Sequence, residues 1–178
     1  MKKSSPASAN LFDVRDAPKL SAAEAKRFHS NVAKILYLAK GVRPECLAAV
    51  GFLSTRIHCC DMDDAAKLDR LLGYIAATRE RGITLRIGEK MAVRAFIDAA
   101  YGVHSDSGKS HTGCSIVLGQ AGPVYAKSTK QKIVTKSSTE AEQVGLSDTA
   151  SQAIHLRNFV ICARIQLYGA DETWRTRL

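Results

Sequence analysis

The sequence lacks the marks of a secreted or membrane-spanning protein. Its five cysteines include no C-x-x-C pair, and their odd number and the adjacent Cys59 and Cys60 argue against a disulfide framework and a zinc site. No stretch approaches the 18 apolar residues that a transmembrane helix requires, and residues 1–10 carry no apolar core of a secretory signal. We therefore expect free thiols in a reducing intracellular compartment, cytoplasm or nucleus, and no membrane partner.

Acidic residues are scarce relative to basic ones. The 178 residues include 26 lysines and arginines but 17 aspartates and glutamates, which gives a formal net charge of +9. Such an excess points to a polyanionic partner, of which nucleic acid is the first candidate. With 46% hydrophobic and 24% charged residues the chain is expected to be globular. Its length allows one large domain or two small ones.

The N-terminal half has the periodicity of helices. Residues 1–20 are rich in serine, alanine and asparagine and are expected to form a flexible lead-in, whereas residues 21–82 are expected to form three short amphipathic helices. The first begins at the S-x-x-E pair Ser21 and Glu24, and the acidic run Asp61–Asp64 suits the start of the third. The apolar stripes of these helices predict a core and show no catalytic cluster.

The pattern changes at Gly82. Alternating or β-prone segments follow, then a turn signal over residues 119–122, and then a long helical segment. The expected fold class is therefore α/β in the broad sense (α+β), with residues 83–168 forming antiparallel strands and a helix and residues 169–178 a tail. The expected elements are strands at Ile83–Ile87, Ala92–Asp98, Gly113–Leu118 and from Val124 to about Val134, and a helix from about Ser138 to Ala163.

A basic stretch joins the last strand to the long helix. Lys127, Lys130, Lys132 and Lys136 are candidates for contacts with nucleic-acid phosphates, which position a duplex without reading its sequence. The alternative is a solvated basic strand face. Just beyond the last lysine, Ser137 and Glu140 form another S-x-x-E pair, which has the spacing of a capping box at the start of a helix.

Several motifs in this half share residues and spacing with a known family. They are Asp98–Asp106, Ser110–Gly113, Ser128–Lys132 and Thr135–Glu142. Together they resemble the ribonuclease H region of copia-type retrotransposon polyproteins. Upstream, Phe28–Ala39, Arg43–Glu45 and Leu68–Ile75 resemble the helical, thumb- or connection-like segment that follows the polymerase core in those proteins. The resemblance runs from about Asn10 to Phe159.

The resemblance implies a chemistry. Ribonuclease H enzymes cut the RNA strand of RNA–DNA hybrids with a carboxylate cluster that holds two Mg²⁺ ions about 4 Å apart. Asp98 matches the family's first metal-binding aspartate, and Glu142 matches the glutamate of the long helix; both are expected to be catalytic metal ligands. Their carboxylates should then lie within roughly 4 to 7 Å of each other.

Other carboxylates compete for this role. Glu140 is the rival of Glu142, and two positions along a helix differ by about 200° in direction. Glu142 shares a stripe with Leu146, Ala150 and Ala153, which favours it as the residue facing the sheet and leaves Glu140 as the cap. Asp106 and Asp148 are better interpreted as loop and helix-surface residues.

The sequence also departs from the family. After Phe159 no recognisable strand supplies the further catalytic aspartates, and the surroundings of Asp171 do not match. We therefore expect a fragment that joins the end of a reverse transcriptase to the first half of a ribonuclease H, inactive alone, with Mg²⁺ as cofactor of any remaining activity. Its partners would be an RNA–DNA hybrid and the rest of the Pol polyprotein or another subunit. The alternative is a non-catalytic nucleic-acid-binding remnant.

Overall fold

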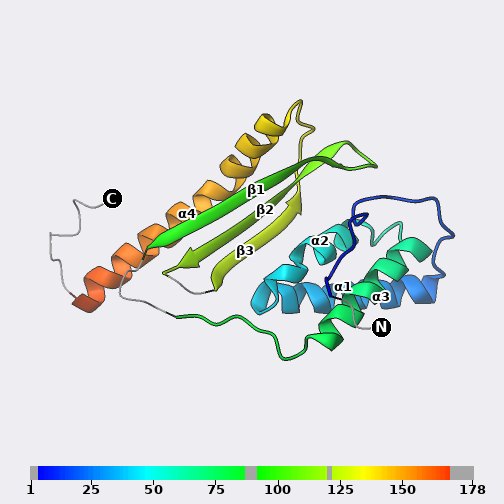
Figure 1. Ribbon diagram of the computed structural model, residues 1–178, viewed down its shortest axis with the longest axis horizontal. Coiled ribbons are helices and arrows are strands. Elements are labelled where there is room, and N and C mark those ends of the chain that lie inside the picture. Colours follow the sequence, from blue (N-terminus) through cyan, green and yellow to red (C-terminus); the bar gives the residue numbers. More distant parts are fainter. Residues whose placement is uncertain (1–3, 87–91, 120–121, 169–178) are drawn as a thin grey trace.

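The computed structural model describes residues 4–86, 92–119 and 122–168, the last five of these by their backbone alone. A helical half and a sheet half lie side by side, and the long last helix covers the far face of the sheet (Figure 1). In chain order the elements are α1 (Ala22–Gly41), a 3-10 turn (Pro44–Cys46), α2 (Leu47–Thr55), α3 (Met62–Ala77), β1 (Val93–His104), β2 (Lys109–Leu118), β3 (Pro123–Lys130) and α4 (Ser138–Tyr168). The predicted order of helices, antiparallel strands and long helix is confirmed.

Capping boxes begin two of the helices, as their sequences predict. At α1 the Ser21 hydroxyl accepts the amide of Glu24, whose carboxylate accepts the amide of Ser21. Asp61 and Asp64 form the same reciprocal pair at α3. Each box satisfies amides that a helix N-terminus otherwise leaves without partners, and this fixes where the helix starts.

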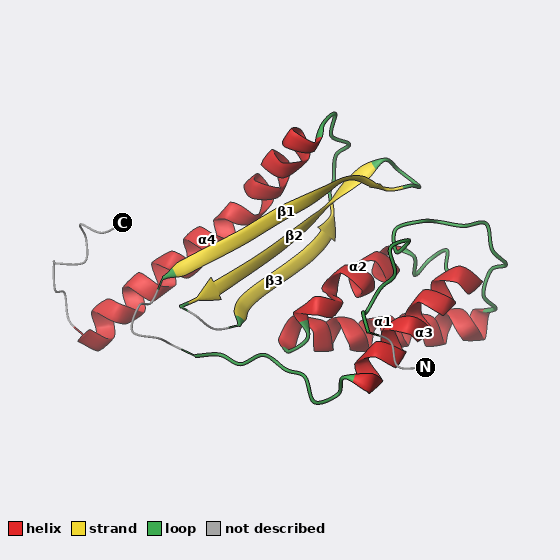
Figure 2. Cartoon of the chain, viewed as in Figure 1, coloured by secondary structure: helices red, strands yellow, loops and turns green. Residues whose placement is uncertain are grey.

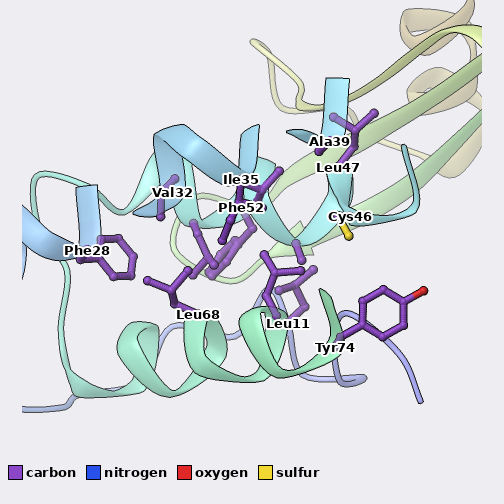
Figure 3. Packing of buried hydrophobic residues seen from close by; sticks show 14 of the residues in the cluster. Leu11, Phe28, Val32, Ile35, Ala39, Cys46, Leu47, Phe52, Leu68 and Tyr74 are labelled. Atoms are coloured by element: carbon purple, nitrogen blue, oxygen red, sulfur yellow. The ribbon is translucent and has the colours of Figure 1, made fainter. Parts of the chain in front are cut away.

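The main hydrophobic core lies among α1, α2 and α3 (Figure 3). The apolar stripe of α1 faces that of α3, and α2 packs against both helices and, on another side, against β3. Burying these side chains is the main source of stability for helices this short. The buried members include Phe28, Val32, Ile35, Ala39, Leu47, Val50, Phe52, Leu53, Leu68, Leu71 and Tyr74.

The expected flexible lead-in is wrong for the residues that the structure describes before α1. Leu11 is 6% exposed and belongs to the helical core. The ring of Phe12 lies 5.7 Å from that of Phe52 on α2 and 4.9 Å from each of the rings of His104 and His111 in the sheet. Two apolar side chains with ready partners thus outweigh the polar composition of the segment.

The sheet is an antiparallel meander with the order β1-β2-β3 (Figure 2). Its register pairs Asp98 with Gly113 and Ala100 with His111, and an irregularity follows before His104. At that irregularity Gly102 has a φ of 61°, a left-handed conformation that suits glycine. One face of the sheet packs on α4 and the other on the helical half (Figure 1).

Two strand predictions fail in part. Of Ile83–Ile87, residue 87 lies outside the described residues, and 83–86 form no strand. Their backbone meets the sheet through one hydrogen bond, from the Gly122 amide to the Thr84 carbonyl, and a single bond does not make a ladder. β3 ends at Lys130 rather than near Val134. Residues 120 and 121 of the expected hairpin turn are not described.

In the described part of the chain, no helix is both long enough and apolar enough to cross a membrane.

Candidate functional site

The two candidate catalytic carboxylates come from β1 and from the helix α4 that packs on the sheet. Asp98 lies on β1, and Glu142 in the second turn of α4; both are exposed. Glu142 Oε1 accepts a hydrogen bond of 3.1 Å from the amide of Ala99. That amide belongs to the peptide group that directly follows Asp98. The long helix therefore brings the Glu142 carboxylate to the backbone of the aspartate with which it was predicted to act.

Alternation along β1 directs the two side chains differently. Ile97 faces α4, since a Cβ added to Gly145 of that helix would lie 3.6 Å from Ile97 Cγ2. Successive residues of a strand point to opposite faces, so the Asp98 side chain starts toward the other face of this edge strand. The predicted approach of the Asp98 and Glu142 carboxylates to within metal-sharing distance stays a prediction.

Glu140 caps the helix and Glu142 contacts β1, as the sequence predicts, but the side of α4 that faces the sheet is not the predicted one. Glu140 accepts the amide of Lys136, and its own amide donates to the Ser137 hydroxyl, so it caps the helix. The stripe of α4 that faces the sheet is Ala141, Gly145 and Thr149, not the stripe containing Leu146, which is 56% exposed. Glu142 reaches β1 from the margin of this buried stripe.

The side chains present do not fit a two-metal centre. Among the described residues no group of three or more histidine, cysteine, aspartate or glutamate side chains could hold a metal ion. Asp106, in the turn between β1 and β2, forms an ion pair with Lys130 of β3, and Asp148 is exposed on α4. Asp171, the other aspartate considered, lies outside the described residues. Asp98 and Glu142 alone offer too few carboxylates for two Mg²⁺ ions.

The four candidate lysines have three different surroundings. Lys130 pairs with Asp106 at 2.9 Å and its side chain is only 19% exposed. Lys127 is half-buried on β3 opposite Cys114. Lys132 and Lys136 are exposed in the segment between β3 and α4, and neither makes an ion pair within the part of the chain that the structure describes.

Gln131, in the same motif as the lysines, holds three elements together. Its side-chain amide donates to the Thr112 hydroxyl on β2 at 2.9 Å and to the Ala141 carbonyl on α4 at 2.8 Å. Its backbone amide donates to the Ser110 carbonyl. These bonds fix the first turn of α4, and with it Glu142, over the sheet. Gln131 was named only as part of the motif; its burial between elements left no periodic signal in the sequence.

A buried histidine pair was likewise missed as a unit. His104 Nε2 lies 3.0 Å from His111 Nδ1, and His111 Nε2 lies 2.7 Å from Ser128 Oγ. Burial lowers the pKa of each histidine to about 4, with the charge of Lys130 acting in the same direction on His104. A buried neutral pair of this kind, packed against the ring of Phe12, suits a structural role.

Comparison with known proteins adds the chain's ancestry. It is 36% identical to the retrovirus-related Pol polyprotein from transposon RE2 of Arabidopsis thaliana, over 68% of this chain and 8% of that protein. It is 33% identical to the Pol polyprotein from transposon RE1 of the same plant, over 76% and 10%. It is also 32% identical to secreted RxLR effector protein 161 of Plasmopara viticola, over 71% and 89%.

The chain thus spans about a tenth of the length of the Pol polyproteins that it matches. No protein-family model matches it, and no solved structure matches it significantly. Each of these matches covers more than two thirds of this chain. The chain is thus related to retrotransposon Pol polyproteins over more than two thirds of its own length, which supports an origin as a retrotransposon Pol-derived fragment.

Proposed function

We propose that this chain derives from a copia-type Pol polyprotein, at the junction of the reverse transcriptase and the first half of the ribonuclease H domain. We propose further that it does not cleave RNA–DNA hybrids efficiently by itself. The motifs around Asp98 and Glu142 support the ancestry, and the hydrogen bond from the Ala99 amide to Glu142 supports a site at this place in the fold. That bond is the single observation that carries the proposal.

The lack of further ligands supports the second part of the proposal. Two carboxylates hold a hydrated Mg²⁺ weakly, because each offsets only part of the charge of the ion. Removing one group that stabilises a transition state typically costs about 3 kcal/mol, and each 1.36 kcal/mol is about tenfold in rate. The further ligands that this proposal requires lie outside the described residues or on another polypeptide, such as the remainder of Pol.

A cleavage assay tests this proposal. Purified chain would be incubated with a labelled RNA–DNA hybrid and Mg²⁺, beside an intact ribonuclease H as the positive control. The variants Asp98→Asn and Glu142→Gln keep the shapes of the side chains, and the amide oxygen of the glutamine can still accept from Ala99. We expect the unmodified chain to be no faster than Asp98→Asn. Turnover close to that of the intact enzyme, abolished by Asp98→Asn, would contradict the proposal.

Binding of nucleic acid without cleavage is the second candidate function, and the segment between β3 and α4 favours it. Lys132 and Lys136 are exposed there, next to the helix that carries Glu142. Lysines near a duplex replace condensed counterions on its phosphates, so binding should weaken steeply as salt rises. Lys130 contributes less, because Asp106 already offsets its charge.

Fluorescence anisotropy at several salt concentrations measures this binding. The Lys132→Gln, Lys136→Gln double variant should reduce the slope of log affinity against log salt by roughly two for a duplex, because each phosphate contact contributes about 0.9. Lys34→Gln, which removes an exposed lysine from α1, is the matched control and should leave the slope unchanged. Equal slopes for all three proteins would exclude this segment as the contact.

A further inference from the structure

The two edges of the sheet differ in how they are protected. The outer edge of β3 faces α2, which approaches it closely at Gly51, where an added Cβ would lie 3.0 Å from the Ser128 carbonyl oxygen, and a groove between the helices and β3 lies beside this contact. β1 forms the opposite edge, and within the described ranges no strand pairs with its outer side. An uncovered edge strand presents unpaired amides and carbonyls that can pair with another chain.

The hydrogen-bonding pattern shows which groups β1 presents. The Gly119 amide donates to the Ala92 carbonyl, so even-numbered residues of the strand bond to β2. The amide of odd-numbered Ala99 points outward, where Glu142 accepts it. By the same alternation the amides and carbonyls of Val93, Ala95 and Ile97 also point outward. Glu142 therefore ends the available edge, and the open part is the first half of β1.

We infer that a second copy of this chain pairs with this edge, antiparallel, about a two-fold axis at Phe96. In this register the Ala95 of each copy lies opposite Ile97 of the other, and both have outward-pointing groups. Four backbone hydrogen bonds would follow from the two symmetric pairs. The two Phe96 side chains, each 58% exposed in the single chain, would meet across the axis.

Charge selects this register over its neighbours. With the axis at Phe96, Arg94 of one copy lies opposite Asp98 of the other, and symmetry makes this favourable pair twice. An axis at Arg94 or at Asp98 would place like charges together. An axis at Ala95 or Ile97 would place a charge against Phe96. Arg94 already donates one N–H to the Gly119 carbonyl and keeps its other donors for a carboxylate.

The exposed apolar side of α4 fits the same partner. Leu146 and Ile154 are each 56% exposed and lie two turns apart on the helix. Leu146 follows Glu142 by one turn, and Glu142 reaches past β1 to an outward amide, so this side of α4 overhangs the open edge. In the paired form two α4 helices would run side by side over one continuous sheet, with these side chains between them. The arrangement is closed by its symmetry, so it yields a dimer rather than a fibre.

Analytical ultracentrifugation over a range of protein concentrations tests the proposal. The unmodified chain should dimerise, and Arg94→Glu and Asp98→Arg should each weaken the dimer about tenfold or more, because each places like charges opposite each other. The double variant Arg94→Glu, Asp98→Arg should restore it. Lys34→Glu makes the same charge change as Arg94→Glu, but on α1, and should have no effect. A chain that is monomeric throughout, or a dimer indifferent to the two single reversals, would overturn the proposal.

Ala95→Pro provides a second test that does not involve charge. It removes an outward amide of an edge strand and leaves the β1–β2 bonds intact, so the monomer should fold and the dimer should be lost. Circular dichroism of the variant establishes its folding. Hydrogen exchange should show the amides of Ala95 and Ile97 becoming protected as the concentration of the unmodified chain rises. Protection that does not depend on concentration would contradict the proposal.

Discussion

His104 and His111 form a buried polar pair inside the molecule. His104 is 1% exposed and His111 6%, and the Phe12 ring lies against both. A charged imidazole is poorly solvated there, and this lowers the pKa of each to about 4. In the unfolded chain a histidine has a pKa near 6.5. Between these values the unfolded state binds more protons, so folding loses stability as the pH falls from about 6.5 toward 4.

The first prediction is that acidification destabilises the fold through this pair. Between pH 7.5 and pH 5 the loss should be about 1 to 2 kcal/mol for each histidine, because both are neutral when folded and protonated when unfolded. Urea unfolding at each pH measures it. His111→Gln should be less stable than the unmodified chain at pH 7.5 and show a flatter pH profile. Parallel profiles for the two proteins would contradict the assignment.

A single glycine sets the distance between the helical half and the sheet. Gly51 on α2 faces the Ser128 carbonyl, and a Cβ there would meet that backbone oxygen at 3.0 Å. The second prediction is that Gly51→Ala destabilises the chain by about 1 to 3 kcal/mol, since backbone on both sides must move apart. Gly41→Ala is the matched control, because a Cβ at Gly41 meets nothing within 4 Å. Denaturant melts should show a change of 1 kcal/mol or less, of either sign, for Gly41→Ala.

At the scale of elements, the capping box of α3 is buried, whereas that of α1 is exposed. At α3 the cap residue Asp61 is 2% exposed, and its carboxylate also accepts from Arg56 Nη2 at 2.9 Å. Arg56 is shared with Asp64, at 3.0 Å from Nε. Removing the Asp61 carboxylate would therefore remove the cap of α3 and also one of the two carboxylates that pair with the buried Arg56 guanidinium.

The third prediction compares the two caps. Asp61→Ala should cost about 3 kcal/mol, whereas Ser21→Ala at the exposed capping box of α1 should cost about 1 kcal/mol. Thermal and urea unfolding of the two variants give the comparison. Equal losses would mean that the ion pair with Arg56 contributes nothing beyond the cap.

Elements with local signals could be predicted from the sequence, and those that depend on a distant partner could not. The starts of α1 and α3 are determined by residues three positions apart, so these starts can be predicted from the local sequence alone. Ile83–Arg86 has strand-like alternation but forms no ladder, because only one backbone hydrogen bond, from the Gly122 amide to the Thr84 carbonyl, joins it to the sheet. Ile133 and Val134 are β-prone, yet they lie in the exposed bend beyond β3.

The candidate site shows the same limit. Asp98 and Glu142 were found by their motifs, while the contact of Glu142 with the Ala99 amide depends on how α4 lies on the sheet. Helical periodicity predicted a buried stripe through Leu146, and that stripe is exposed because the small residues Ala141 and Gly145 let α4 approach the strands instead. Burial of small residues is a weak signal in a sequence, since they carry little hydrophobic surface.

At the scale of the molecule, one side chain joins the three parts. Phe12, from the segment before α1, contacts Phe52 in the helical half and both histidines in the sheet half. The Val14 amide adds a 3.1 Å bond to the Ser105 hydroxyl. The N-terminal segment thus holds the two halves against each other.

The fourth prediction is that Phe12→Ala destabilises the whole chain by about 2 kcal/mol, through lost apolar burial and a cavity between the halves. Tyr37→Ala, which removes an aromatic ring that is 86% exposed on α1, should stay within 0.5 kcal/mol of the unmodified chain. Global unfolding followed by both circular dichroism and histidine resonances measures the effect. A loss no larger than that of Tyr37→Ala would rule out the joining role.

The contact between Val14 and Ser105 spans 91 positions of the chain, and this has a consequence for synthesis on the ribosome. The N-terminal segment emerges first, but its sheet partners lie at and near the turn between β1 and β2, which is translated much later. Helices α1 to α3 can collapse during the interval, since their contacts are local. At an elongation rate of about 20 residues per second, the ring of Phe12 therefore lacks its histidine partners for several seconds after it is synthesised, and for longer at slower rates.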